Sequence, residues 1–338
     1  MKKWFYPLLY VLGVCSCTST QVMPDNREYT YNIHFPEPPV EIMSNIDKEA
    51  TQYDSILINY FNIIKVKEDL YYMYYAAVGR LSERADDLGQ GLFFAHSSNG
   101  FKWDRHFPQK SGPNYIFGSE IKEQSVFMVP WDDQFPFRLI ANIEENGKEL
   151  MCIWKSDNGI VFNNRVTVMD DFLHDTQNVV VPTKDNMKLY TRLWDGWNRK
   201  IATGLLGKDG KLLTSLDTLK IDHVYNSAAS KLDSQFDILF PTYMNNKMSD
   251  PQTDKAYLKS FLIKDGICQE IECGINKWIK PEEKWMLVSP GIIDIKGDTY
   301  IAYNTRTWSH DTKKPDEGIS RYYIIRVKID KVYLDIDY

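Results

Sequence analysis

The heptapeptide Ser97-Ser98-Asn99-Gly100-Phe101-Lys102-Trp103 recurs as Ser156-Asp157-Asn158-Gly159-Ile160-Val161-Phe162, so the pattern Ser-x-Asn-Gly-x-x-aromatic occurs twice, 59 residues apart. An Asn-Gly pair supplies the positive φ angles that a tight hairpin between two strands requires. Each copy follows a short apolar run typical of a β-strand. We therefore expect two hairpins at equivalent positions of a structural repeat.

The chain from residue 56 onward continues this repeat. Short β-branched and aromatic runs alternate with turn residues about every 8 to 15 positions, and they group into five units of roughly 50 to 65 residues. The units begin near residues 56, 125, 179, 225 and 285, and the closing strand of the fifth is expected at 332–336. This spacing favours an all-β, five-bladed β-propeller with about four antiparallel strands per blade over paired β-sandwiches or a parallel β-helix.

The N-terminus has the features of a bacterial export signal. Two lysines precede an apolar run too short to span a membrane, and Val14-Cys15-Ser16-Cys17 resembles a lipobox. We expect residues 1–16 to be a lipoprotein signal peptide and Cys17 to carry the lipid; an ordinary secretory signal is the alternative. Residues 17–52 should form a tether and N-terminal strap, and residues 53–338 a single propeller domain. The protein would then be lipid-anchored at the bacterial cell envelope, touching the membrane only through that lipid.

The composition excludes several classes of protein. A net charge of -6 without a basic patch argues against a nucleic-acid partner. Cys152, Cys268 and Cys273 are too few for a disulfide framework and lack zinc-site spacing, so we expect buried thiols and no metal site. Phosphate-loop, serine-hydrolase elbow and zinc-protease motifs are absent. The aromatic content of 14% suits both β-strands and surfaces that contact carbohydrate.

Two motifs carry a resemblance to a known group of proteins. The repeated Ser-x-Asn-Gly turn resembles the Ser-x-Asp-Gly-x-x-Trp turn of five-bladed β-propeller glycoside hydrolases, such as families 43, 32 and 117. His174-Asp175-Thr176-Gln177-Asn178, followed by Tyr190-Thr191-Arg192, resembles a segment of uncharacterised bacterial glycosidase-like lipoproteins. The likeness covers about residues 50 to 330 and implies both the propeller fold and hydrolysis of glycosidic bonds.

The resemblance also implies where the catalytic groups lie. In such propellers the residues just before each innermost strand converge on one mouth of the central channel. Asp54, Glu120 and Asp175 occupy these positions in the first three units, with Glu123 as a competitor of Glu120. Three carboxyl groups suit glycoside hydrolysis, which needs a base or nucleophile and an acid of raised pKa. We expect Asp54 as the base and Glu120 as the acid, and an inverted anomeric centre if a water fits between them.

The sequence departs from the patterns of the named families. Family 43 places Asp, Asp and Glu in the first three blades, whereas this chain offers Asp, Glu and Asp. The signatures of family 32 are absent. A family 117-like arrangement uses a histidine as the acid, and His174 or His310 would fit that role. The role of each residue is therefore left open at this stage.

Further polar and aromatic residues are candidates for substrate binding. Arg192 can hold a sugar carboxylate or hydroxyls in a bidentate manner, with a structural ion pair to Asp175 as the alternative. Trp194, Trp197 and Trp308 are candidate stacking platforms, with core packing as the alternative. The predicted substrate-binding residues are His174, Gln177, Asn178, Arg192, Asn226 and His310.

These features predict an exo-acting glycosidase that cleaves a plant or microbial oligosaccharide or polysaccharide by paired carboxylate chemistry. Such hydrolysis requires no cofactor, and a calcium or other ion in the central channel is compatible with it. The first alternative is a non-catalytic, carbohydrate-binding surface lipoprotein with the same propeller. The second is a structural or protein-interaction propeller, which would lack an acidic pocket.

Overall fold

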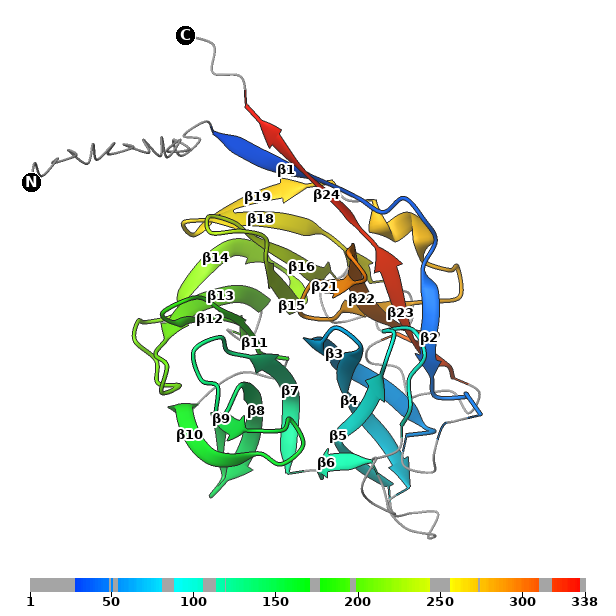
Figure 1. Cartoon of the computed structure of the whole chain (residues 1–338), viewed down its shortest axis with the longest axis vertical. Helices are drawn as coiled ribbons and strands as arrows, with labels where there is room; N and C mark the ends of the chain where they lie inside the picture. Colours follow the sequence, from blue (N-terminus) through cyan, green and yellow to red (C-terminus); the bar gives the residue numbers. More distant parts are fainter. Residues whose placement is uncertain are drawn as a thin grey trace, which may run out of the picture.

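The computed structural model describes residues 28–48, 50, 54–80, 88–105, 114–118, 120–170, 177–194, 199–243, 256–272, 274–309 and 318–334. Five antiparallel sheets follow one another around a central axis, in chain order from blue to orange in Figure 1. The fold is a five-bladed β-propeller, as the repeat predicts. Helical structure in the described part is limited to the 3-10 helix η1 (Ile275–Trp278).

The first four blades are each built from consecutive strands. Blade one contains β3 (Leu57–Lys67), β4 (Leu70–Arg80), β5 (Leu88–Ser97) and β6 (Tyr115–Phe117). Blade two contains β7 (Ile121–Met128), β8 (Phe137–Glu145), β9 (Lys148–Ser156) and β10 (Asn163–Asp170). Blade three contains β11 (Val179–Pro182), β12 (Met187–Trp194), β13 (Arg199–Leu206) and β14 (Asp217–Asp222). Blade four contains β15 (Val224–Lys231), β16 (Asp237–Tyr243), β18 (Ser260–Lys264) and β19 (Ile267–Ile271), with β17 (Tyr257–Leu258) beside β16.

The fifth blade joins the two ends of the chain. Its inner strands are β20 (Trp285–Val288), β22 (Asp298–Arg306) and β23 (Ser320–Arg326), with β21 (Ile293–Ile295) beside β22. Its outermost strand is β2 (Val40–Ser44), which pairs with β23. The fourth strand of blade five therefore comes from the range 17–52, which was predicted as a tether and strap, and not from residues 332–336 as predicted. Closure by an N-terminal strand ties the ring shut through backbone hydrogen bonds.

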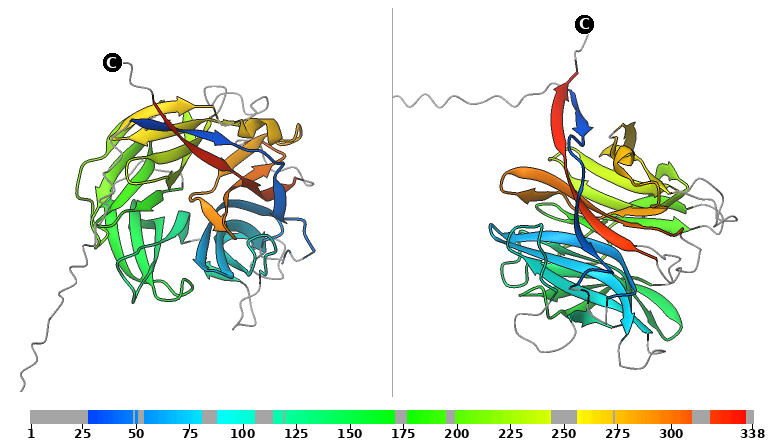
Figure 2. Two further views of the ribbon diagram at one scale, coloured as in Figure 1. Left: turned by 45° about the horizontal axis from the view of Figure 1, so that its top comes forward. Right: turned by 90° about the vertical axis from the view of Figure 1, so that its right-hand side faces the viewer.

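The C-terminal strand instead forms a separate two-stranded sheet. Strand β24 (Lys328–Tyr333) pairs with β1 (Tyr29–His34), and the pair reaches beyond the rim of the propeller (Figure 2). Two tyrosines of β1 fasten this sheet to blade four, because the hydroxyls of Tyr29 and Tyr31 both donate to Asp233, at 2.7 and 2.6 Å. The range 28–48 is thus part of the folded domain.

Side-chain alternation along each strand explains how the blades pack. In β4, Tyr71, Met73 and Tyr75 pack against blade five, whereas Tyr72 and Tyr74 pack against blade two. Successive side chains of a strand point to opposite faces of the sheet. Each blade packs between two neighbouring blades, so such a strand is apolar on both of its faces. Five separate apolar clusters, one between each pair of neighbouring blades, form the core.

The repeated heptapeptide forms the same turn in blades one and two. Ser97 Oγ accepts from the backbone N–H of Gly100 at 2.9 Å, and Asn99 Oδ1 accepts from the N–H groups of the next two residues. The second copy repeats these bonds. Within these two turns the glycines have positive φ, 77° at Gly100 and 75° at Gly159, whereas the asparagines do not. The asparagines therefore contribute through their side chains and not through their φ angles.

No helix in the described ranges is long and apolar enough to cross a membrane. Within those ranges Cys152 is a buried free thiol, as predicted, and Cys268 is a partly buried one. Cys273 lies outside the described residues, as do Cys17 and the predicted signal peptide.

Candidate active site at one mouth of the channel

The two ends of the central channel are distinguished by the direction of the inner strands. The later halves of β3, β7, β11 and β15, with the residues after β20, line one cavity of about 340 Å³. All five inner strands therefore run in the same direction along the axis. We call the end where they begin, near residues 57, 121, 179, 224 and 285, the entry mouth. Of the sequence-predicted residues, Asp54, Glu120, Gln177, Asn178 and Asn226 lie just before or near the starts of these strands.

Two side chains bridge the inner strands across the axis. Gln177 Nε2 donates to the backbone carbonyls of Gln124 at 3.0 Å and Phe61 at 3.5 Å, so it links blades one, two and three. Asn62 pairs with both backbone groups of Val126, as a neighbouring strand would. These carboxamides satisfy backbone groups on the free edges of the inner strands, which would be costly to bury unpaired.

Asn178 is used in a similar way between blades. It is fully buried, its Nδ2 donates to Asn142 Oδ1 at 2.8 Å, and its Oδ1 accepts from the Thr191 hydroxyl at 2.7 Å. Gln177 and Asn178 thus lie at the predicted mouth, and their side chains are hydrogen-bonded to other protein groups. Their binding of substrate stays a prediction.

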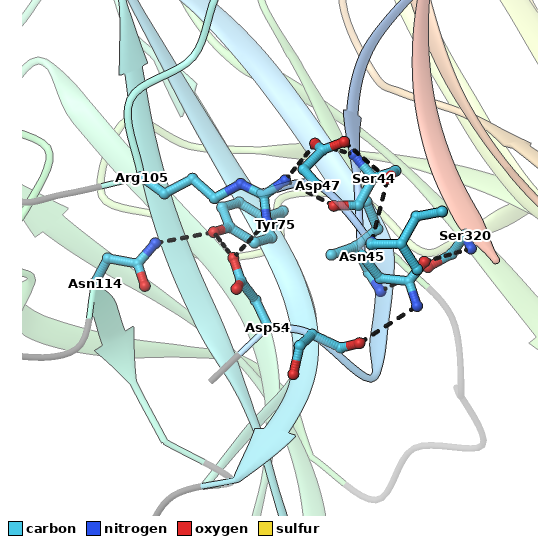
Figure 3. Close-up of polar contacts among 11 residues, drawn as sticks. Ser44, Asn45, Asp47, Asp54, Tyr75, Arg105, Asn114 and Ser320 are labelled. Atoms are coloured by element: carbon cyan, nitrogen blue, oxygen red, sulfur yellow. Dashed lines mark hydrogen bonds and ion pairs between the residues drawn. The ribbon is translucent and has the colours of Figure 1, made fainter. Parts of the chain in front are cut away.

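Asp54 lies at the predicted place before the first inner strand, but it is enclosed. Its carboxylate is 0% exposed, accepts from the Tyr75 hydroxyl at 2.7 Å, and pairs with Arg105 at 3.2 Å (Figure 3). Burial, followed by the nearby charge of Asp54, raises the pKa of Tyr75 well above its usual range. The Arg105 guanidinium also contacts Ser44 O and Asp47 at the end of β2. These contacts tie the closing strand to blade one, which is a structural function.

Glu120 lies in the connection that enters blade two and is exposed. Its Oε1 accepts from the backbone N–H of Gly118 at 3.1 Å. This is a local contact within the same connection. The structure thus places a buried, ion-paired Asp54 and an exposed Glu120 near the entry mouth, and no contact joins the two in the described part of the chain.

The remaining predicted site residues lie outside the described residues. These are His174, Asp175 and His310, together with the stacking candidate Trp197 and the side chain of Trp194. The side chain of Glu123, the competitor of Glu120, is also outside them. Among the side chains that are described, no group of three or more His, Cys, Asp or Glu is arranged to hold a metal ion.

Three inner strands carry a β-bulge at the entry mouth, which the sequence reasoning did not foresee. In each case two residues of the inner strand face one residue of the second strand, because the pairing register shifts by one. The paired residues are Asn59-Tyr60 opposite Ala76, Glu123-Gln124 opposite Ala141, and Tyr225-Asn226 opposite Thr242. Bulges bend a strand and redirect side chains, and they concentrate near active sites.

Each bulge contains a side-chain amide with an unused polar atom. Asn59 Oδ1, Gln124 Nε2 and Asn226 Nδ2 are buried atoms without a hydrogen-bond partner in the described structure. Gln124 is 4% exposed and Asn226 is 0% exposed, and the Oδ1 of Asn226 accepts from Thr242 N at 3.3 Å. Because most buried polar groups are paired, three such atoms in the bulges of three blades indicate a place for a polar ligand.

A cluster of arginines and aromatic rings lies beside the blade-four bulge. We call it the arginine–aromatic cluster; it consists of Arg192, Arg199, Tyr225, Trp285, Arg306 and Trp308. Arg192 is 0% exposed, donates to Tyr225 O at 2.6 Å, and lies 4.8 Å from the centre of the Tyr225 ring. The predicted candidates Arg192 and Trp308 are thus in one cluster with residues that sequence reasoning missed.

The sequence holds a signal for this cluster. Tyr190-Thr191-Arg192-Leu193-Trp194 ends the second strand of blade three, and Arg306-Thr307-Trp308 ends the second strand of blade five. The shared Arg-x-Trp at the same blade position would have identified Arg306 as a partner of Arg192. Arg199 has no such signal, because only its pairing opposite Trp194 brings it to the same end of blade three.

Comparison with known proteins agrees with this architecture. No family model and no curated protein matches the sequence. Among solved structures, an α-L-arabinofuranosidase from Podospora anserina in complex with cellotriose superposes with a TM-score of 0.55 at 10% identity, over 88% of this chain and 97% of that one. An α-L-arabinanase from Cellvibrio cellulosa complexed with arabinohexaose gives 0.52 at 9% identity, over 82% and 92%. A thermostable family-43 glycoside hydrolase gives 0.52 at 12% identity, over 88% and 92%.

At these identities the likeness establishes the fold. The chain shares the five-bladed propeller of family 43 glycoside hydrolases and related arabinofuran-active enzymes, as the sequence motifs predicted. The same scaffold carries unrelated functions in many proteins, so the function of this chain depends on the residues at its entry mouth.

Proposed function

We propose that this protein is a glycoside hydrolase whose active site is the entry mouth of the propeller. The observation that carries the proposal is the set of three bulged inner strands with unused amide atoms at Asn59, Gln124 and Asn226. Amide oxygens and N–H groups at fixed positions suit a ligand rich in hydroxyls, and aromatic rings beside them suit the faces of sugar rings. The structural neighbours that hold cellotriose and arabinohexaose support a carbohydrate ligand.

For the chemistry, we propose paired carboxylates with Asp175 as a central member. Asp175 lies two residues before Gln177, whose side chain reaches the carbonyls of blades one and two at the axis. Hydrolysis requires a carboxylate and a carboxylic acid on opposite sides of the scissile bond, and no cofactor. Asp54 and Glu120 remain the candidates for the second group; the Arg105 pair of Asp54 would have to rearrange before Asp54 could act as a base.

We further propose an exo-acting enzyme at the cell envelope. An exo mode suits a site at the closed mouth of a channel that is bridged on its axis by Gln177 and Asn62, because a chain could not thread through it. The lipobox-like Val14-Cys15-Ser16-Cys17 supports export and lipid attachment at Cys17. The range from Cys17 to Glu28 would then connect the lipid to β1.

Activity on a substrate panel tests the proposal. The full mature chain should release monosaccharide from the ends of furanosides or of uronic-acid-containing oligosaccharides, and Asp175→Asn should lower kcat by at least about a hundredfold. Glu145→Gln is the matched control. Glu145, at the end of β8, forms an exposed ion pair with Arg165 of β10, the outermost strand of blade two. Full turnover by Asp175→Asn would refute the role of Asp175, and no turnover of any glycan would refute the hydrolase.

One observation favours the alternative of a non-catalytic, glycan-binding protein. Both predicted acids that the structure describes are engaged: Asp54 with Arg105 and Tyr75, and Glu120 with its neighbour Gly118. A binding protein would need the amide atoms and the rings but no acid. Calorimetric binding of an oligosaccharide that is recovered intact after prolonged incubation would decide for this alternative.

A further inference from the structure

The end of the channel opposite the entry mouth holds a cavity of its own. Its volume is about 340 Å³, and residues of all five blades line it. We call it the exit cavity. At its inner end the Asn62 carboxamide bonds to Val126, and Gln177 bridges blades one, two and three next to that pair, on the side of the entry mouth. These bridging side chains lie between the exit cavity and the entry mouth, so the two are separate places on one axis.

The inner strand of blade two shows how the cavity wall is built. Val126 N–H donates to Asn62 Oδ1 across the axis at 3.0 Å, whereas Val129 N–H donates to Pro136 O on the opposite side at 2.9 Å. Along an antiparallel strand, the backbone groups of successive residues point to opposite edges. Met128, two residues after Val126, therefore turns its N–H and C=O toward the axis, where it lines the exit cavity.

Three other blades present their backbone in the same way. Phe61 O accepts from Gln177 at the axis, and every second residue after it on β3 has the same orientation. In blades three and four, the N–H groups of Thr183 and Leu232 bond to their own hairpins, so the residues just before them face the axis. The axis-facing residues of these three blades all line the exit cavity: Ile63, Lys65, Val180, Pro182, Ala229 and Lys231.

This wall is a ring of backbone donors and acceptors. Within the described ranges, no other protein group bonds to these backbone groups from the axis side. At the entry end, by contrast, the carboxamides of Asn62 and Gln177 occupy the equivalent groups. Free strand edges form hydrogen bonds readily with any ligand that offers both donors and acceptors. The exit cavity therefore suits a polar ligand that approaches several strands at once.

The charges around the exit cavity favour a neutral ligand. The Lys65 ammonium pairs with Asp294 at 2.6 Å and with Glu68 at 3.2 Å, so two carboxylates balance it. Lys231 is exposed, and solvent and salt screen its charge. The ligand also has to be small, because a volume of about 340 Å³ is near the lower limit of ligand pockets, roughly 300 Å³.

We propose that the exit cavity binds one neutral sugar residue, free or at the end of a short glycan, at a site separate from the entry mouth. A sugar carries hydroxyls around the whole perimeter of its ring, and each hydroxyl both donates and accepts. These hydroxyls match backbone groups that converge from four blades. A peptide strand would pair with one edge and leave the other three unmatched. The inference does not rest on the proposed function, because it needs no reaction.

Backbone amide signals test the site residue by residue. The full mature chain, labelled with ¹⁵N, is titrated with D-galactose, D-glucose and L-arabinose. At least one sugar should shift the amide signals of Ile63, Met128 and Lys231 in a saturable manner, with a Kd on the order of 1 mM. Cyclohexanol has a similar ring but one hydroxyl, and it should leave these signals in place. No saturable shift with any of the three sugars, or equal shifts with cyclohexanol, would overturn the proposal.

A variant that fills the cavity gives a second test. Ile292 lines the exit cavity and is partly buried, so Ile292→Trp should weaken sugar binding at these amides by at least about fivefold. Ile267→Trp is the matched control, because Ile267 is 73% exposed on β19, an outer strand of blade four, and it should bind as the parent does. If Ile292→Trp does not fold, Lys231→Trp at the exposed rim replaces it. Unchanged affinity in the folded variant would refute the site.

A capped valine tripeptide tests the choice of ligand. Tighter saturable binding of this peptide than of any of the three sugars, read from the same amides, would overturn the sugar in favour of strand addition. The outcome is independent of the hydrolase. A lack of turnover on every glycan would leave the amide shifts unaffected, and missing shifts would leave hydrolysis at the entry mouth unaffected.

Discussion

The hydroxyl groups of Tyr60 and Tyr225 lie 2.9 Å apart, although their strands belong to blades one and four. Each tyrosine sits in a β-bulge near the start of its inner strand, and each is less than a tenth exposed. Tyr225 is also the ring on which Arg192 and Arg199 lie. The tyrosine pair therefore couples non-adjacent blades at the entry mouth and holds the arginine–aromatic cluster against blade one.

Removing one hydroxyl of this pair should weaken the domain slightly. Tyr60→Phe and Tyr225→Phe each lose a hydrogen bond but keep the ring, so we expect each to lower the free energy of unfolding by about 1 kcal/mol. The double variant should cost less than the sum, because both single variants remove the same bond. Urea unfolding of the four proteins measures this coupling, and strictly additive losses would show that the hydroxyls do not interact.

The glycine of the second repeated turn should not tolerate alanine. At Gly159, φ is 75° and an added Cβ would come within 2.4 Å of the Tyr74 hydroxyl, which itself donates to Gly159 O. We expect Gly159→Ala to cost about 3 kcal/mol of unfolding free energy, from backbone strain and the clash together. Gly147→Ala is the matched control, because φ is 73° there and nothing lies within 4 Å, so only about 1 kcal/mol should be lost. Equal losses would mean that the contact with Tyr74 has no effect.

Asp54 should prove important for folding whether or not it takes part in catalysis. Asp54→Asn removes the charge that faces Arg105 at a fully buried position, and we expect a loss of about 3 kcal/mol in unfolding free energy. Asp47→Asn removes the second carboxylate of the same arginine, which is 32% exposed, and should cost about 1 kcal/mol. Thermal and urea unfolding measure both. A stable Asp54→Asn protein with lost hydrolysis would instead support the catalytic prediction for Asp54.

The attachment of β1 to blade four should depend on acid pH. Burial alone would raise the pKa of Asp233, but bonds from Tyr31, Tyr29 and two backbone N–H groups outweigh it and hold that pKa at about 2. A carboxylate with a lowered pKa stabilises the fold above its unfolded pKa of about 4, and that contribution disappears as the pH falls from about 4 toward 2. We expect about 2 kcal/mol, after allowance for solvent screening, to be lost in this window.

Asp233→Asn tests this assignment. The variant should be less stable than the parent at pH 7 and should show a flatter dependence of its urea midpoint between pH 4 and pH 2. Tyr31→Phe removes one of the two hydroxyl donors. Its stability at pH 7 and the pH dependence of its urea midpoint should lie between those of the parent and Asp233→Asn. A variant whose midpoint falls with pH as steeply as that of the parent would show that another carboxylate is responsible.

Part of the candidate site follows from the sequence and part does not. The position of Asn226 and Gln177 before or at the start of inner strands can be read from the repeat, because strand starts alternate with turns at blade spacing. The bulges cannot, since each depends on the register between an inner strand and its partner, which is set by packing of whole blades. For the same reason the side chains of Tyr225 and Arg199 were not among the predicted site residues, and the strand that contains Arg199 was not predicted.

The sequence by itself determined the five-bladed propeller, because turn geometry and strand alternation are local properties of a few neighbouring residues. Both Ser-x-Asn-Gly turns formed, with positive φ at Gly100 and Gly159 and with the serine side chain bonded to the glycine N–H. Only the tertiary structure decided that β2 closes the ring, that Asp54 meets Arg105, and that Tyr60 meets Tyr225. These contacts join residues from about 50 to nearly 300 positions apart, and their formation depends on which polar groups the closed ring buries together.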